Sequence, residues 1–387
     1  MRVLVAPDKF KGCLTAAEVA AAVAAGLLDG KPDLDIVQVP VADGGDGTVA
    51  AALSADYTRV EVSATGPTGQ PVDTGYAIRD HRAVVELADV VGLSRLPEQR
   101  PDPLNASTFG LGVVIRDAIN RGATEIVLGL GGSASTDGGA GLVQALGASL
   151  TNDAAHELPP GAAALSTLRR LDLTQLRATL EGVQFVVACD VDNPLLGPNG
   201  AATVFGPQKG ASPLDVEQLE GALTVWAQLV AKTTGEDLVH RPGAGAAGGT
   251  GFAALALLGA ELRTGIELVL ELVGFDHLLR GADLVITGEG SLDEQSLAGK
   301  APVGVAVAAG RADPPVPVVA VAGRTTLSAP RLREAGIARA YPLDVLEPDL
   351  ATSIAQAKPL LRRIGTHIAQ DWLTGSSASS RTTRFLH

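Results

Sequence analysis

RVLVA, residues 2–6, is an apolar run that begins at the second residue and leads into a polar, glycine-containing turn. Its length and its Val and Leu content predict a buried β-strand. The segment TAAE at 15–18 has the spacing of a helix capping box and predicts a helix that runs to about residue 28. A second strand pattern, LDIVQVP at 34–40, follows. Strand, helix and strand in this order indicate an α/β protein with parallel pairing.

The same pattern returns towards the other end of the chain. Three buried-strand patterns separated by helical segments occur there: ADLVITGEG at 282–290, VPVVAVAGR at 316–324 and ARAYPLDV at 338–345. In between, alternating runs over 57–88 are joined by the turn signals GPTGQP and DHR, which predict an antiparallel meander. We therefore predict one parallel sheet built from both ends of the chain, with a second, mixed α/β domain inserted into it.

The predicted domain limits follow from these patterns. Residues 1–60 plus 283–372 are expected to form the parallel-sheet domain, and residues 61–282 the inserted mixed α/β domain. Within the insertion, a long helix is predicted at about 213–233. Residues 375–387, GSSASSRTTRFLH, are predicted to be a disordered tail.

Composition and charge narrow the class of protein. The chain of 387 residues is 46% hydrophobic and 19% charged, which is typical of a globular protein. Its net charge of -13 argues against general nucleic-acid binding, which needs a basic face. The two cysteines, Cys13 and Cys189, exclude a disulfide framework and fit a reducing cytoplasm. The most apolar later segment, 252–275, contains four charged residues, so we expect no membrane span.

Five glycine-rich or acidic segments share one position, because each follows an apolar strand: residues 7–12, 43–48, 129–141, 189–200 and 287–300. Ligands of open parallel sheets bind outside the carboxyl ends of the strands, and glycines allow a close approach of the backbone. One such loop alone is better interpreted as a plain strand-to-helix connection. Five of them, all with carboxylates and two with lysines, favour a binding site.

Several catalytic motifs are absent. The sequence contains no GxxxxGK[ST] phosphate loop, no GxGxxG with a suitable acidic residue downstream, and no GxSxG elbow. The six histidines lie outside the loops described above. Carboxylates and lysines remain, and they suit phosphoryl transfer, which depends on positioning and charge stabilisation more than on covalent help.

The carboxylates Asp190 and Asp192 form an Asp-x-Asp pair at the end of a predicted strand. Such oxygens can hold Mg²⁺, which prefers carboxylates, waters and substrate phosphates. The alternative is that both side chains cap backbone N–H groups of their own loop. Glu289 is likewise either a ligand or a charge at the start of a helix.

The basic residues of the loops are candidates for anion binding. Lys9, Lys11, Lys209 and Lys300 lie in or beside glycine-containing loops, where an ammonium group can meet phosphate or carboxylate. Each of them can equally be a solvated surface charge. Arg241 precedes a glycine-rich segment and is suited to bidentate binding of a carboxylate.

Taken together, these segments resemble the bacterial glycerate kinase type-1 family. The matching stretches, in chain order, are VLVAPDKFKGCLTAAEVA, PVADGGDGT, GLGGSASTDGGAG, ACDVDNPLLGPNGAATVFGPQKGA, PGAGAAGGTGFA and ADLVITGEGSLDEQSLAGKAPVGVA. They run from residue 3 to about 307, and the resemblance continues more weakly to about 372. Lys9 stands where the family usually has Ser, and Asp46 where it often has Glu; Lys9 adds a cation.

The resemblance implies ATP-dependent phosphorylation of D-glycerate to 2-phosphoglycerate with Mg²⁺. It also implies two unlike α/β domains, a discontinuous flavodoxin-like domain and an inserted domain similar to a restriction-endonuclease fold. Three alternatives stay open: a 3-phosphoglycerate product, a kinase of another small hydroxy acid or of a lipid or nucleotide, and a non-catalytic binding or regulatory protein of the same fold. The expected partner is a small-molecule substrate, with no nucleic acid and no membrane; a homodimer is compatible with the sequence.

These considerations lead to a set of candidate residues. We expect Asp190 to act as base or metal ligand, with Asp192 beside it, and Lys209 and Lys300 to bind phosphate or carboxylate during catalysis. The other predicted substrate- and nucleotide-binding residues are Asp8, Lys9, Lys11, Asp43, Gly44, Gly45, Asp46, Thr48, Gly131, Gly132, Ser133, Asp137, Arg241, Gly288 and Glu289.

Overall fold

The computed structural model of the protein describes residues 1–373 and divides into two compact units. The terminal unit comprises Met1–Ala42 and the described residues from Val273 onward, and the inserted unit comprises Asp43–Leu272. Each unit has its own sheet and its own buried apolar cluster. The predicted tail at 375–387 lies outside the described residues.

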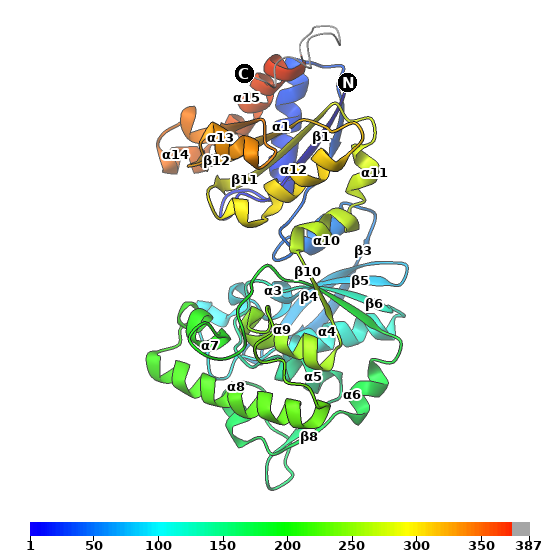
Figure 1. The fold of residues 1–387 in the computed structure, drawn as a ribbon, viewed down its shortest axis with the longest axis vertical. Coiled ribbons are helices and arrows are strands. Elements are labelled where there is room, and N and C mark those ends of the chain that lie inside the picture. The colour runs from blue at the N-terminus through cyan, green and yellow to red at the C-terminus, as the bar shows by residue number, and fades with distance from the viewer. Residues whose placement is uncertain (374–387) are drawn as a thin grey trace. The chain divides into compact units, whose positions relative to one another are not determined.

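The sheet of the terminal unit has five parallel strands in the order β13-β12-β11-β1-β2. The strands are β1 (Arg2–Pro7), β2 (Asp35–Gln38), β11 (Leu284–Leu292), β12 (Val318–Thr325) and β13 (Arg339–Pro342). β1 pairs with β11 so that Val3 lies opposite Leu284, which joins the two ends of the chain in one sheet (Figure 1). The prediction of a parallel sheet built from both ends is confirmed.

Helices cover this sheet on the terminal unit. They are α1 (Ala16–Gly30), α11 (Phe275–Leu279), α12 (Ala301–Arg311), α13 (Ala329–Glu334), α14 (Leu350–Ala355) and α15 (Ala357–Ile368). α1 begins at the predicted capping box, in which Thr15 and Glu18 each accept the other's backbone N–H. α1 and α15 lie side by side (Figure 1), and a Cβ at Gly26 would collide with the carbonyl of Arg362, so the close crossing requires glycine.

The sheet of the inserted unit has six strands in the order β10-β9-β6-β5-β4-β3. These strands are β3 (Thr58–Thr65), β4 (Pro71–Arg79), β5 (Arg82–Glu86), β6 (Glu125–Gly129), β9 (Gln184–Ala188) and β10 (Glu261–Arg263). β3, β4 and β5 pair antiparallel, as the meander prediction requires, whereas β5, β6, β9 and β10 pair parallel. A separate antiparallel pair is formed by β7 (Ser149–Thr151) and β8 (Arg170–Asp172).

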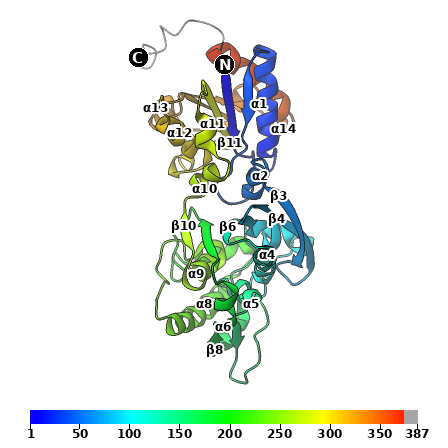
Figure 2. The same cartoon turned by 90° about the vertical axis from the view of Figure 1, so that its right-hand side faces the viewer.

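The helices of the inserted unit are α2 (Thr48–Leu53), α3 (Leu87–Val91), α4 (Phe109–Asn120), α5 (Ala140–Leu146), α6 (Thr174–Thr179), α7 (Ala201–Phe205), α8 (Pro213–Thr234), α9 (Ala246–Leu257) and α10 (Gly265–Leu272). The long helix predicted at about 213–233 is α8. It begins at a capping box formed by Ser212 and Asp215. Its Trp226 is fully buried and donates its ring N–H to the carbonyl of Gly138 at 3.0 Å. α4 and α5 pack closely (Figure 2), because Gly112 leaves room for the carbonyl of Leu142.

The compact units divide at Ala42 and Leu272, whereas the sequence patterns place the domain limits near 60 and 283. The difference at the first limit has a physical reason. Val49 and Ala52 of α2 are buried in one apolar cluster with Leu268 and Leu272 of α10. The turn at 43–48 and the helix that follows it therefore belong to the core of the inserted unit.

Among the described residues, no helix combines the length and the hydrophobicity needed to cross a membrane.

Candidate active site

Two of the predicted glycine-rich loops touch one another at the carboxyl ends of the parallel strands of the inserted unit. The GGDGT turn, residues 44–48, packs against the loop that leaves β6. A Cβ at Gly129 would lie 2.9 Å from the carbonyl oxygen of Gly44, and a Cβ at Gly131 would lie 3.1 Å from the Cα of Gly45. A larger residue at Gly129 would force the backbone of the turn to move, and one at Gly131 would be tightly packed, so glycine lets the two loops meet this closely.

The GGDGT turn is held by a hydrogen bond within the turn and by two hydrogen bonds to Glu86. Gly44 and Gly47 have φ values of 88° and 105°, in the left-handed region that favours glycine. The hydroxyl of Thr48 donates to the carbonyl of Gly45 at 2.8 Å. Glu86, the last residue of β5, accepts the backbone N–H groups of Gly47 at 2.6 Å and Val49 at 2.9 Å. Glu86 therefore caps the start of α2 from a different part of the chain.

Burial perturbs this carboxylate. The Glu86 side chain is only 2% exposed. Desolvation raises its pKa to about 7, with a further contribution from the negative charge of Asp89, while the hydrogen bonds from Val49 and Gly47 oppose the shift. Sequence reasoning missed Glu86. The signal was available, since Glu86 is a carboxylate at the end of an apolar strand, as Asp190 is.

Asp190 leaves β9 and accepts the backbone N–H of Gly265, the first residue of α10, at 2.8 Å. Partial burial raises the pKa of Asp190, the charge of Asp43 raises it further, and the Gly265 hydrogen bond lowers it. The structure thus brings the predicted residues Asp43 and Asp190 together at the start of α10. Asp192 lies two residues further along on an exposed stretch, and its charge helps to raise the pKa of Cys189, which burial raises most.

The buried lysine of the site is Lys209. It is 2% exposed, and its Nζ donates to the Ser133 hydroxyl at 2.7 Å and to the Ser135 carbonyl at 2.5 Å. Burial lowers its pKa to about 7, although the charge of Asp137 opposes the shift. A solvated surface charge, the alternative interpretation of this lysine, does not apply.

Asp137 is fully buried and ties three stretches of the chain together. It accepts the backbone N–H of Thr108 at 2.8 Å, the Thr108 hydroxyl at 2.9 Å and the Ser107 hydroxyl at 3.2 Å. Its remaining partners are the backbone N–H groups of Gly139 at 3.2 Å and Gly141 at 3.3 Å. Burial raises its pKa, and these hydrogen bonds lower it. In this structure both oxygens of Asp137 hold the loop between β6 and α5.

The glycine-rich segment at the start of α9 completes this cluster. Gly248 has a φ of 69°, and its carbonyl accepts the backbone N–H of Gly138 at 3.0 Å. A Cβ at Gly248 would lie 2.8 Å from the Nζ of Lys209. The N–H of Gly245 donates to the carbonyl of Asn193 at 2.8 Å, so the segment also touches the loop that carries Asp190 and Asp192. Arg241 is exposed in the turn just ahead of it.

A second group of predicted residues meets on the terminal unit, where β1 and β11 end. The N–H of Asp8 donates to the carbonyl of Gly288 at 2.8 Å, and the N–H of Lys9 donates to the Asp8 carboxylate at 2.6 Å. Glu289 follows on β11 and is buried. Lys11 is exposed on the β1 side. The structure therefore gathers Asp8, Lys9, Gly288 and Glu289 at one edge of the sheet.

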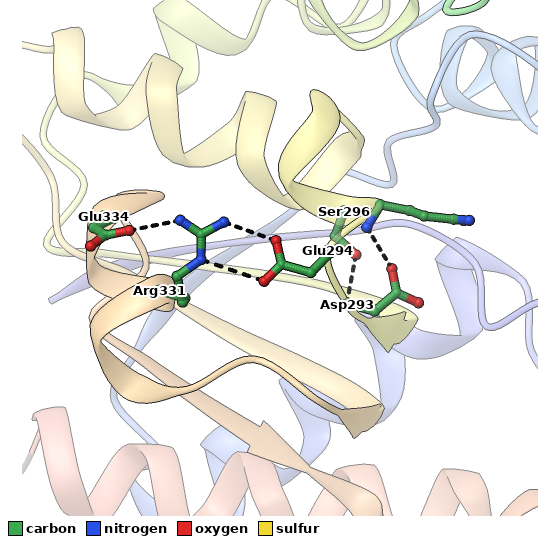
Figure 3. A network of polar contacts seen from close by, with 6 residues as sticks. Asp293, Glu294, Ser296, Arg331 and Glu334 are labelled. Carbon is green, nitrogen blue, oxygen red and sulfur yellow. Dashed lines mark hydrogen bonds and ion pairs between the residues drawn. The ribbon is translucent and has the colours of Figure 1, made fainter.

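The loop that follows β11 leads to Lys300, which occupies the N-cap position of α12 without a capping hydrogen bond from its side chain. Figure 3 shows how this loop is held. The Ser296 hydroxyl accepts the backbone N–H of Asp293 at 3.0 Å, and the Arg331 guanidinium pairs with Glu294 at 2.8 Å and with Glu334 at 2.9 Å. These ion pairs are exposed and are worth little in stability.

Comparison with known proteins identifies the class. The model of the "Glycerate kinase family" matches residues 3–373, and the chain belongs to that family. A glycerate kinase of Bacillus subtilis is 43% identical over 340 residues, 87% of this chain and 88% of that protein. A glycerate 2-kinase of Escherichia coli is 43% identical over 329 residues, 84% of this chain and 86% of that protein.

A solved structure agrees over nearly the whole chain. The crystal structure of a protein provisionally named glycerate kinase 2 from Salmonella typhimurium LT2 has a TM-score of 0.83 and 40% sequence identity, and covers 96% of this chain and 98% of its own. The expected family is confirmed: the protein has glycerate kinase activity and is a phosphotransferase, and ATP as its second substrate is implied by the family.

Proposed function

We propose that the protein is a glycerate 2-kinase that transfers the γ-phosphoryl group of ATP to the 2-hydroxyl of D-glycerate. The relative from Escherichia coli that carries the name glycerate 2-kinase is 43% identical over 329 residues, which favours this hydroxyl. The observation that carries the chemistry is the Asp190 carboxylate. It is held at 2.8 Å by the N–H of Gly265 at the carboxyl edge of the sheet, beside the glycine-rich loops.

In the proposed step, Asp190 accepts the proton of the 2-hydroxyl. The hydroxyl oxygen forms a bond to the γ-phosphorus, and the bond from that phosphorus to the β–γ bridging oxygen breaks, which releases ADP. The raised pKa of Asp190 makes the carboxylate a stronger base for this proton. Lys209 and Asp137 act through the loops that they hold, since both side chains are buried among protein groups.

The carboxylates on the exit loop of β9 suit a magnesium ion. When bound, Mg²⁺ neutralises charge on the transferring phosphoryl group. It is bound in kinases by one or two carboxylates together with substrate phosphates, so a small set of acids is sufficient. Among the described residues, no group of three or more His, Cys, Asp or Glu side chains is placed for a metal. If Asp190 is a metal ligand and not the base, Asp190 and Asp192 would hold the ion, and the charge of Asp43 beside Asp190 would favour a cation there.

We assign the terminal unit to the flavodoxin-like folds. Numbered within the unit, its strand order β13-β12-β11-β1-β2 is 5-4-3-1-2, the flavodoxin order read from the other edge. Folds of this order bind ligands where the strand order reverses, which is between β1 and β11. Asp8 and Glu289 follow these two strands, and we propose that Lys9, Lys11 and Lys300 bind anionic groups of the substrates near them.

Two finer assignments accompany this proposal. The inserted unit is assigned to folds similar to restriction endonucleases, on its mixed sheet with a parallel centre and an antiparallel edge. A cytoplasmic location is proposed because Cys13 and Cys189 are both free thiols.

The test is a coupled assay of ADP release. The wild-type protein is expected to release ADP from ATP only with D-glycerate and Mg²⁺ present, and phosphorus NMR is expected to show 2-phosphoglycerate. A product that is solely 3-phosphoglycerate would refute the choice of hydroxyl. Faster turnover of another small hydroxy acid than of D-glycerate would refute the choice of substrate.

A further inference from the structure

The Glu86 carboxylate joins the end of the central strand β5 to the GGDGT turn and the start of α2 through two hydrogen bonds from backbone N–H groups. One of its oxygens accepts the N–H of Gly47 and the other that of Val49. Gly47 caps α2 without a side chain of its own, so Glu86 supplies the missing cap. Above about pH 7, where Glu86 is ionised, these hydrogen bonds are about twice as strong as neutral ones.

Placing the Glu86 carboxylate here costs free energy, because the group is buried and lies near other negative charges. Glu86 is buried beside the acidic residues Asp89 and Asp46, and the charges of both raise its pKa. Burying a carboxylate near other carboxylates costs free energy unless hydrogen bonds compensate for the lost hydration. Its partners are the backbone N–H groups of the half-buried Gly47 and the buried Val49, and the latter would otherwise lack a partner away from water.

The same contact limits how the turn meets a nucleotide. The N–H groups of Gly47 and Val49 point at Glu86 and are not accessible to a phosphate. Backbone contacts of this turn with a nucleotide are therefore expected from the residues ahead of them, Gly44–Asp46. Gly45 lies in this stretch; its N–H donates to the Asp43 carboxylate at 3.4 Å, and an added Cβ there would meet only ordinary contacts, at 3.5 Å from the Asp43 carboxylate and 3.7 Å from Gly131.

We propose that Glu86 is a positioning residue of the kinase site: by holding the N–H groups of Gly47 and Val49 it fixes the GGDGT turn in the conformation that binds ATP. This inference rests on the proposed function. Glu86 does not touch the substrate itself; it acts through the turn.

The experiment compares the wild type with Glu86→Gln and Glu86→Asp. Gln keeps the shape but offers one acceptor oxygen and directs an amide group at the other N–H. Asp keeps the charge but is one methylene shorter. The KM for Mg·ATP is expected to rise about tenfold in Glu86→Gln, the equivalent of one lost charge-assisted hydrogen bond, and less in Glu86→Asp. The KM for D-glycerate is expected to change by less than about twofold, as expected for an effect confined to the nucleotide.

Hydrogen exchange of the ligand-free proteins provides a readout that does not depend on activity. The peptide covering residues 43–53 is expected to exchange faster in Glu86→Gln than in the wild type. Glu61→Gln is the matched control, because Glu61 is an exposed residue of β3 whose side chain pairs with Arg59. It is expected to leave both the exchange and the KM for Mg·ATP unchanged.

The outcomes separate the two proposals. If the wild type shows no glycerate-dependent turnover, the proposed function fails, and the exchange measurement still shows whether Glu86 orders the turn. If the wild type is active and Glu86→Gln lowers kcat and melting temperature with an unchanged KM for Mg·ATP, Glu86 is only structural and the inference is overturned. If Glu86→Gln does not fold, the KM of Glu86→Asp decides in the same way.

Discussion

The ammonium group of Lys209 lies 2.7 Å from the hydroxyl of Ser133, and both side chains are buried. The two residues are 76 positions apart in the chain. The contact connects the turn before α8 to the loop after β6. It places a lysine of unusually low pKa inside the cluster of glycine-rich loops.

A first prediction concerns the pH dependence of stability. The pKa of Lys209 is lowered from 10.5 to about 7 on folding, so between these values the unfolded chain binds the proton and the folded protein does not. The free energy of unfolding therefore carries no penalty from Lys209 above about pH 10.5, and it decreases as the pH falls towards 7 because the unfolded chain binds the proton more tightly. From pH 7 to 9 the free energy of unfolding of the wild type should rise relative to Lys209→Met, by at most about 1.4 kcal/mol per pH unit. Urea denaturation of both proteins at several pH values measures this, and a constant difference would contradict it.

A second prediction concerns the glycines of the GGDGT turn. Gly45→Val should weaken Mg·ATP binding at nearly unchanged melting temperature, because the site of the added Cβ has no close neighbour. Gly44→Val should instead lower the melting temperature, since φ is 88° there and the Cβ would lie 2.7 Å from the Cβ of Ala188. Calorimetric titration with Mg·ATP and melting curves distinguish the two. Normal ATP binding by Gly45→Val would show that the turn is only a connection.

A third prediction concerns the proposed base. Asp190→Asn retains the shape and one acceptor for the N–H of Gly265 but removes the charge. Loss of a general base costs about 10²–10⁴-fold in rate, so kcat should fall by at least the low end of this range. Nearly unchanged affinity for Mg·ATP is expected for a base, whereas partial recovery with Mn²⁺ would assign Asp190 as a metal ligand. A variant with wild-type kcat would leave Asp190 as a cap of α10, and Asp43 would become the candidate.

A fourth prediction concerns Asp137. Asp137→Asn places an amide group among donors that all point at the carboxylate, from Ser107, Thr108, Gly139 and Gly141. The free energy of unfolding should fall by roughly 1–3 kcal/mol, as for other buried groups left without partners. Asp153→Asn on an exposed loop is the control and should be neutral. Unchanged stability of Asp137→Asn, with loss of substrate binding alone, would return Asp137 to the role of a ligand.

Sequence patterns were sufficient for the strands and for their main pairing. RVLVA and LVITG are continuous apolar runs, and such runs separated by helices pair in parallel, as β1 and β11 do. The meander over 57–88 was readable because its strands are adjacent in the chain and joined by short turns. The division after Ala42 was not readable. It depends on α2 packing against α10, whose residues are more than two hundred positions away.

The sequence by itself determined the family, the α/β class, the insertion of one sheet into another, and the loops in which chemistry is expected. All of these depend on local residue order, which the chain displays directly. The tertiary structure alone decided what each charged residue does: Lys209 is buried against Ser133, Asp137 holds its own loop, and Glu86 lies beneath the GGDGT turn. The physical reason is that burial and hydrogen-bond partners, which set the pKa of a side chain and its access to a ligand, come from segments distant in the chain.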